Sequence, residues 1–165
     1  MIELKTAEEI ERMRKAGRVV GGLLAFLAGR LAPGMKTKEL DDAAVGFLRS
    51  SGAEPAFLGY RGFPATVCVS VNEEVVHGIP GERRIQDGDV VSIDAGAKIE
   101  GFYADAAITV GVGSLTSDAT RLIDVTKRSL DRAIALTTAR HRLSDISCAV
   151  QETVEQAGFS VVRDF

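Results

Sequence analysis

The sequence predicts a domain of the α/β (α+β) class, because three hydrophobic patterns follow one another along the chain. Residues 6–51 carry apolar side chains at helical spacing. Between residues 67 and 110 the period changes to 2, which is typical of strands. After residue 115 helical spacing returns. The 165 residues, 45% hydrophobic and 26% charged, have the composition of one soluble globular domain.

Two helices are expected before the strands. Thr6 is followed by an acidic first turn, which predicts an N-cap for a helix that runs to about Arg30. Thr37 is expected to cap a second helix, which ends at "SGAEP" after about Ser51.

Four strands are expected next. Residues 67–71 alternate valines with small polar side chains, and "VNEE" is expected to turn the chain back into residues 75–77 as a hairpin. Residues 90–97 and 102–110 form the following strand pair.

The late helices, expected at 116–138 and 144–157, repeat the early ones at a constant offset of 106 positions. The matching pairs are Leu24 with Leu130, Leu40 with Ile146, Leu48 with Val154, and Gly52 with Gly158. Helices can share apolar spacing by chance, so the repeat has two explanations. If it is real, the second copy has the helices without the strands, although "FSVVRDF" is typical of a strand that begins.

Charge and cysteine content exclude several classes of protein. The net charge of -3 argues against direct nucleic-acid readout and against binding to an anionic membrane. No apolar run approaches the ~18 residues that span a bilayer. The charged N-terminus lacks the apolar core of a signal peptide, and Cys68 and Cys148 form no disulfide framework. A cytoplasmic location is therefore expected.

Two aspartates interrupt the apolar strands of "VVSIDAGAKIEGFYADAAITV". A tight turn between Ile99 and Glu100 would make Asp94 and Asp105 direct cross-strand neighbours. Facing carboxylates destabilise a strand pair, so either a shared proton or a divalent cation would have to offset their repulsion. If the register differs by one residue, one aspartate faces solvent instead.

His77 begins "HGIPG" at the end of an expected strand. Its ring could reach a cleft as metal ligand or proton shuttle, or it could be an ordinary surface residue. His141 lies among charges and receives no role. Cys68 alternates with valines and is expected to pack as a small hydrophobe, because no basic neighbour activates it as a nucleophile.

At these residues the chain resembles the type I methionine aminopeptidases. The resemblance rests on "GYRGFPATVCVSVNEEVVHGIPG" (59–81), "DGDVVSIDAGAKIEGFYADAAITV" (87–110) and "GFSVVRDF", and it covers essentially the whole chain. Xaa-Pro peptidases share the fold and both aspartates, but the HGIP context is that of the methionine enzymes. The resemblance implies the pita-bread fold with pseudo-twofold halves, in which residues 1–112 form the first half and 113–165 the helices of a truncated second half.

The resemblance also implies a two-metal site. In that family the aspartate at the position of Asp94 binds one divalent metal in bidentate fashion, and that of Asp105 bridges two ions, which can be Co, Mn, Fe or Zn. The histidine at the position of His77 hydrogen-bonds the substrate near the scissile peptide and helps to stabilise the tetrahedral intermediate. The positions that line the methionine pocket are those of Tyr60, Phe63 and Cys68.

The implied reaction is removal of the N-terminal (initiator) methionine from nascent proteins. The implied partners are the nascent chain and the ribosome, and the complete protein is expected to be a monomer. Phe63 replaces the family's usual tyrosine, and Tyr103-Ala104 replaces His-Gly, so details of the pocket are expected to differ.

A GHGIG-type histidine and two glutamates, which are three of the family's five metal ligands, would lie beyond Phe165. The 165 residues alone are therefore expected to have negligible peptidase activity. The alternative is a non-catalytic pita-bread module that binds a protein or the ribosome, for which two facing carboxylates would have no use.

Overall fold

The computed structural model describes residues 3–163. It contains two compact units, Met1–Leu115 and Thr116–Phe165. Within residues 3–163, no helix combines the length and the apolar character that crossing a membrane requires.

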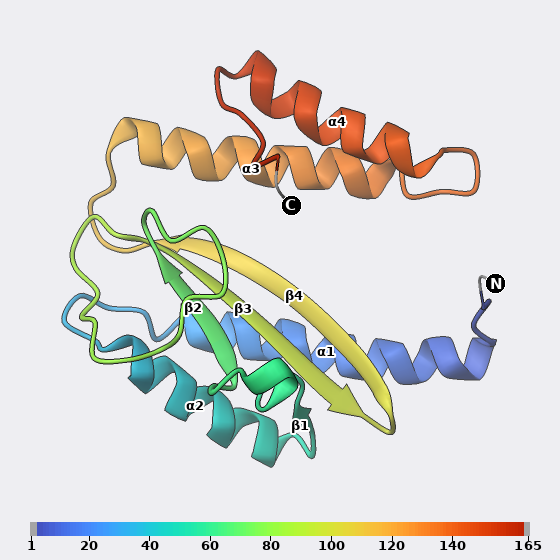
Figure 1. Cartoon of the computed structure of the whole chain (residues 1–165), viewed down its shortest axis with the longest axis horizontal. Coiled ribbons are helices and arrows are strands. Elements are labelled where there is room, and N and C mark those ends of the chain that lie inside the picture. Colours follow the sequence, from blue (N-terminus) through green and yellow to red (C-terminus); the bar gives the residue numbers. More distant parts are fainter. Residues whose placement is uncertain (1–2, 164–165) are drawn as a thin grey trace. The chain divides into compact units, whose positions relative to one another are not determined.

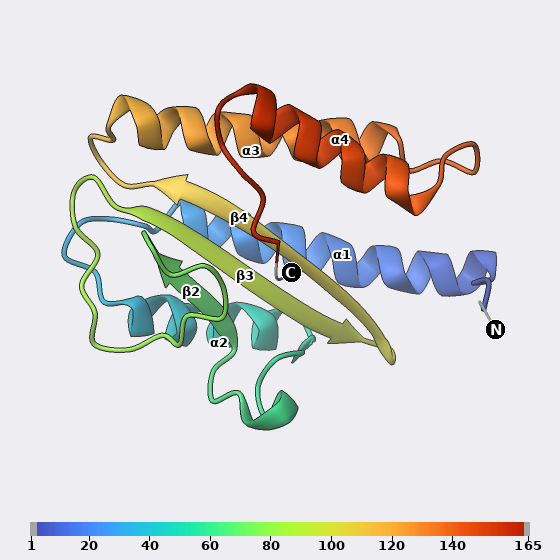
Figure 2. The same ribbon diagram turned by 45° about the horizontal axis from the view of Figure 1, so that its top comes forward.

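The first unit is built on a four-stranded antiparallel sheet (Figure 1). Its central strand is β3 (Val90–Ile99), and β4 (Phe102–Gly111) pairs along one edge of β3. The other edge pairs with β2 (Val67–Val71) and with the short β1 (Glu54–Pro55). Figure 2 shows the same order of strands from a second direction. The predicted strands at 67–71, 90–97 and 102–110 are therefore confirmed.

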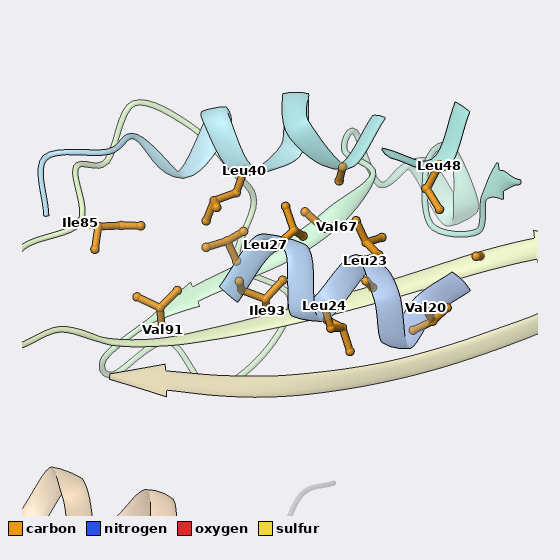
Figure 3. Packing of buried hydrophobic residues seen from close by; sticks show 14 of the residues in the cluster. Val20, Leu23, Leu24, Leu27, Leu40, Leu48, Val67, Ile85, Val91 and Ile93 are labelled. Carbon is orange, nitrogen blue, oxygen red and sulfur yellow. The ribbon is translucent and has the colours of Figure 1, made fainter. Parts of the chain in front are cut away.

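Helices α1 (Ala7–Ala28) and α2 (Thr37–Ser50) pack on one face of this sheet and form the hydrophobic core with it. Figure 3 shows Leu23, Leu24 and Leu27 of α1 beside the strands. The strand residues of the core occupy alternate positions: Val67, Val69, Val71, Val91, Ile93, Ala95 and Ala97. Because strand side chains alternate between faces, the residues between them point to the opposite face.

The two predicted helix caps have different outcomes. Thr6 caps α1 as predicted, since its hydroxyl accepts from the Glu9 N–H at 3.2 Å and its own N–H donates to the Glu9 carboxylate at 2.7 Å. The predicted cap at Thr37 is wrong, because Lys36 is the N-cap of α2. The buried Thr37 hydroxyl instead donates to the Gly81 carbonyl at 3.1 Å and accepts from the Gly81 N–H at 2.9 Å. Thr37 therefore binds the loop that follows β2.

The second unit contains α3 (Ser117–Ala135) and α4 (Leu143–Gln156). Arg132 of α3 reaches α4, where its guanidinium lies 3.2 Å from the Glu152 carboxylate. The hydrophobic side chains buried in these helices are Val125, Ala133, Ala149 and Val154. The predicted strand in "FSVVRDF" does not form in residues 159–163, and its last two positions lie outside the described residues.

The helix ends agree with the predicted repeat. Both bounds of α4 lie 106 positions after those of α2. Beyond α2 the Ala53 N–H donates to the Leu48 carbonyl at 3.0 Å, and beyond α4 the Phe159 N–H donates to the Val154 carbonyl at 3.0 Å. This bond, with the left-handed Gly52 and Gly158 beside it, is a common way for a helix to end, so it agrees with the repeat and equally with two unrelated helices.

One carboxylate of α2 holds the beginning of β2. Asp41 Oδ1 accepts from the Thr66 N–H at 2.7 Å and from the Val67 N–H at 3.1 Å. These two bonds place the strand that carries Cys68. Hydrogen bonds to a charged group contribute roughly 1.5–3 kcal/mol each.

We expect Asp41→Ala to lower the free energy of unfolding by about 3 kcal/mol, because two strand N–H groups lose their acceptor. Urea denaturation followed by circular dichroism measures this loss. The matched control is Asp42→Ala, which removes an exposed ion pair with Lys38 at 3.4 Å and should cost less than about 0.5 kcal/mol. Equal losses in the two variants would contradict the anchoring role of Asp41.

Candidate active site

The face of the sheet away from α1 and α2 carries the polar strand residues. Cys68 of β2 lies opposite Asp94 of β3, which in turn lies opposite Ala107 of β4. Directly opposed residues share one face of a sheet. Asp105, two positions from Ala107, is on the same face and lies opposite Gly96. The register thus brings a thiol and two carboxyl groups together.

The predicted direct pairing of Asp94 with Asp105 is wrong by two residues. The turn consists of Glu100 and Gly101, with φ of 50° and 83°, and does not lie between Ile99 and Glu100. Positive φ at both central residues is the hairpin geometry that follows the strand twist. Because the shift is an even number of residues, both carboxyls stay on one face as diagonal neighbours, and neither is turned toward the core.

Asp94 has an oxygen without a partner. Its Oδ1 is buried and accepts no hydrogen bond from the described residues. Burial first, then the negative charge of Asp105, and then a hydrogen bond between the two carboxyls when Asp94 is protonated raise the pKa of Asp94 from 3.8 to about 6. Without a cation, the pair can therefore share a proton. An orphaned buried oxygen beside a second carboxyl group is an unfavourable arrangement that a bound cation would relieve.

The two carboxyl groups fit a divalent cation. Hard cations prefer carboxylate oxygens, and one bound at Asp94 Oδ1 would also cancel the repulsion from Asp105. Within residues 3–163 there is no group of three or more His, Cys, Asp and Glu side chains arranged to hold a metal. Asp94 and Asp105 would therefore supply part of a coordination shell.

His77 lies in a loop, so the predicted strand at residues 75–77 is wrong. Its backbone is left-handed, with φ of 60°. The next residue attaches the loop to β2, since the Gly78 N–H donates to the Ser70 hydroxyl at 3.1 Å and the Gly78 carbonyl accepts from the Val69 N–H at 2.9 Å. These two bonds replace a strand ladder, and they hold the histidine beside the polar face of the sheet.

Tyr60 and Phe63 belong to a short loop that closes on itself. The Gly59 N–H donates to the Phe63 carbonyl at 2.8 Å, and the Tyr60 N–H donates to the Phe57 carbonyl at 2.9 Å. Gly59 and Arg61 both have positive φ, of 80° and 49°. A left-handed arginine costs roughly 1–3 kcal/mol, which is the kind of strain found at functional sites.

Phe57 is a wall of the site that the sequence pattern did not indicate. A Cβ at Gly96 would lie 2.5 Å from the Phe57 ring and 2.9 Å from the Ala56 Cβ. The Ala56 N–H also donates to the Gly96 carbonyl at 3.1 Å. The Phe57 ring therefore packs in the space that a side chain at position 96 would occupy. The one available signal was a glycine inside a strand.

All the predicted site residues line one pocket of ≈ 850 Å³ in the first unit: Tyr60, Phe63, Cys68, His77, Asp94 and Asp105. Other lining residues, which the sequence did not indicate as such, include Phe57, Arg61, Ile79 and Tyr103. His141 lies in the second unit, where its ring contacts the Thr138 hydroxyl at 3.0 Å.

The Cys68 thiol is a neutral part of the pocket. The side chain is 4% exposed, and burial followed by the charges of Asp94 and Asp105 raises the pKa of its thiol to about 11. A thiol with this pKa stays protonated at neutral pH. The prediction that Cys68 packs as a small hydrophobe is confirmed.

Known proteins share this sequence and fold. The profile of metallopeptidase family M24 matches residues 11–165. A methionine aminopeptidase of Clostridium perfringens is 48% identical over 165 residues, which are 100% of this chain and 66% of that protein. A methionine aminopeptidase from Bacillus subtilis is 47% identical with the same coverage. The chain thus spans slightly less than two thirds of the length of these relatives.

The crystal structure of a methionine aminopeptidase from Thermotoga maritima matches with a TM-score of 0.98 and 41% identity, over 100% of this chain and 67% of that one. A prolidase from Pyrococcus furiosus matches with a TM-score of 0.84 and 23% identity, over 94% of this chain and 44% of that one. At this identity the match is evidence for a shared fold and not for a shared function. The fold is the pita-bread fold, as predicted.

Gly78 tests the attachment of the His77 loop. A Cβ at this position would lie 2.2 Å from the Val69 carbonyl oxygen, so we expect Gly78→Ala to displace the loop and lower the melting temperature by roughly 4–8 °C. Differential scanning calorimetry measures the shift. Gly81→Ala is the matched control, because its Cβ would have no neighbour closer than 3.9 Å. Similar melting temperatures for both variants would contradict the close packing of Gly78 against β2.

The raised pKa of Asp94 predicts how stability changes with pH. Between pH 4 and about 6 the carboxyl is ionised in the unfolded chain and still protonated in the folded one, so the free energy of unfolding falls as the pH rises through this range. The difference in the free energy of unfolding between Asp94→Asn and the wild type should therefore rise by about 1–2 kcal/mol in favour of the variant as the pH increases from 4 to 7.5.

Urea denaturation in the presence of a chelator measures this difference. Asp124→Asn, a change at an exposed position of α3, is the control and should show no such trend. A stability difference for Asp94→Asn that is independent of pH would contradict the assignment.

Proposed function

This chain belongs to metallopeptidase family M24, and we propose on that premise that its pocket serves a metal-dependent methionine aminopeptidase, which hydrolyses the N-terminal methionine of peptides. The observation that carries the proposal is the orphaned Oδ1 of Asp94 beside Asp105 in the pocket of the first unit. A buried, repelling carboxyl pair destabilises a binding-only module and is useful where cations bind.

We propose that Asp94 and Asp105 hold two divalent ions, drawn from Co, Mn, Fe and Zn. Bound ions of this kind polarise a scissile carbonyl and activate water. Asp105 would lie between the ions and Asp94 would bind one of them. Asp94 and Asp105 are diagonal neighbours on one sheet face, so both carboxyl groups point to the same side of the sheet.

The remaining pocket residues suit the methionine side chain. Tyr60 and Phe63 present aromatic rings, and Cys68 presents a protonated thiol, so a thioether meets polarizable and uncharged surroundings. Phe57, seated on Gly96, adds a third ring. We assign these residues to substrate binding, because their rings and the neutral thiol match the apolar, polarizable side chain of methionine.

We assign the catalytic role to His77. Its loop is attached to β2 through Gly78, so its ring is held at the pocket that contains both carboxyls. From there the ring can donate a hydrogen bond to the peptide beside the scissile bond and stabilise the oxyanion that forms. The left-handed backbone of His77 is strain of the kind that accompanies such positioning.

Several wider assignments belong to the same proposal. The substrates are nascent chains in the cytoplasm, the ribosome is a partner, and the complete protein is a monomer. Residues 1–112 form one pseudo-twofold half, and residues 113–165 are the helices of the other. Since the described residues offer only two carboxyls to the metals, we infer negligible turnover by the 165 residues alone.

We expect 1 mM Mn²⁺ to raise the melting temperature of the chain by roughly 2–4 °C, because a cation that binds only the folded state stabilises it. Asp94→Asn and Asp105→Asn should each abolish this shift, whereas Asp124→Asn should retain it. Calorimetric titration should also show that Met-Ala-Ser amide binds roughly tenfold more tightly than Gly-Ala-Ser amide.

A shift that persists in both aspartate variants would refute the metal assignment. Binding without preference for methionine would favour the non-catalytic protein-binding module instead. Measurable release of methionine by the 165-residue chain would contradict the inference of negligible turnover.

A further inference from the structure

We propose that Arg61 gives the pocket a preference for peptides that carry a carboxylate shortly after the N-terminal methionine. This inference rests on the proposed aminopeptidase function and adds a specificity-determining residue to it. Of the described residues that line the pocket, Arg61 is the one with a fixed positive charge. The lining also contains the carboxyl groups of Asp94 and Asp105, so the pocket combines both signs of charge.

The guanidinium of Arg61 is available to a ligand. Arg61 takes part in none of the ion pairs formed within residues 3–163. Its guanidinium carbon lies 5.5 Å from the centre of the Tyr60 ring, which orients the side chain without neutralising it. Both side chains are exposed, whereas Cys68 of the same pocket is buried. Arg61 therefore lies toward the solvent side of the pocket.

The strained backbone at Arg61 indicates that the arginine side chain has a function at this position. Its φ of 49° is left-handed, between Gly59 and Gly62 with φ of 80° and 83°. A glycine would occupy the position without strain, yet an arginine is present. The loop is also closed by backbone hydrogen bonds, including Phe63 N–H to the Tyr60 carbonyl at 3.0 Å. A strained and well-held residue at a pocket is a reason to look for function.

The charge arrangement determines which peptides benefit. A bound peptide would place its N-terminus toward Asp94 and Asp105, and its following residues would extend toward the solvent side of the pocket. A carboxylate on those residues would meet Arg61, whose planar guanidinium can bind it in bidentate fashion. The carboxylate can come from an acidic side chain or from the C-terminus of a short peptide, and the chemistry is the same.

The test compares peptide affinities by calorimetric titration of the 165-residue chain in 1 mM Mn²⁺, the condition in which Asp94 and Asp105 are proposed to hold their ions. Met-Ala-Asp-Asp amide should bind about two- to five-fold more tightly than Met-Ala-Asn-Asn amide, as expected for one exposed ion pair. Met-Ala-Asn-Asn with a free C-terminus separates the two sources of the carboxylate. The preference should shrink when the ionic strength is raised from 0.05 to 0.5 M.

Three variants assign the preference to Arg61. Arg61→Gln should abolish it, and Arg61→Gly should abolish it while also relieving the left-handed strain, so that the melting temperature does not fall. Arg30→Gln is the matched control, because Arg30 is an exposed arginine stacked on Phe26 at 5.2 Å and lies outside the pocket. It removes the same charge and should leave the preference unchanged.

Equal binding of all three peptides by the wild type, or a preference that survives in Arg61→Gln, would overturn this inference and leave the proposed function intact. Failure of every peptide to bind would overturn both. Tighter binding of the free-acid peptide alone would support recognition of a carboxylate and identify the peptide C-terminus as its source.

Discussion

The register between β3 and β4 is the constraint on which the site depends. Neighbouring positions of a strand point to opposite faces, so a slip of one residue would move Asp105 into the core formed with α1 and α2. The turn at Glu100 and Gly101 determines where the two strands reverse. Lys15 of α1 reinforces the turn, because its ammonium lies 3.0 Å from the Glu100 carboxylate. Buried residues such as Ile93 hold the same register from the other face.

The two faces of the sheet have opposite energetic effects. Burial of one Val or Ile side chain stabilises a fold by roughly 1.5–3 kcal/mol, and seven strand residues contribute to the core. An orphaned buried carboxyl oxygen costs about 1–3 kcal/mol, and a left-handed side-chain-bearing residue costs a similar amount. Burial of the core on one face therefore offsets part of the cost of the unfavourable groups at Asp94, His77 and Arg61. The fold can keep these groups in an arrangement that is poor for stability and suited to binding.

Most of the secondary structure could be predicted because it depends on local periodicity and capping chemistry. Thr6 has its partner three residues away, so the sequence itself shows the cap. Thr37 looked equivalent, but its partner is Gly81, which is distant in the chain. The same difference explains Phe57, whose seat at Gly96 becomes visible only when β1 and β3 are paired.

The errors at the site have local causes as well. Gly101 indicated a tight turn, but a glutamate is an unusual residue for the other left-handed position, so the reversal was placed one residue early. The valines before His77 resembled a strand, whereas the two hydrogen bonds of Gly78 hold this segment as a loop. The residues of the pocket were nevertheless identified, because the resemblance depended on motif spacing and needed no register.

The environment of Cys68 has a consequence for the chemistry that the pocket tolerates. With a pKa of about 11, roughly one thiol in ten thousand is ionised at pH 7, and only the thiolate reacts readily with peroxide or a disulfide. In the cation-free pocket, burial and the charges of Asp94 and Asp105 together keep this proton in place. The sulfur can therefore line the cation-free pocket with little tendency to become a sulfenic acid or a mixed disulfide.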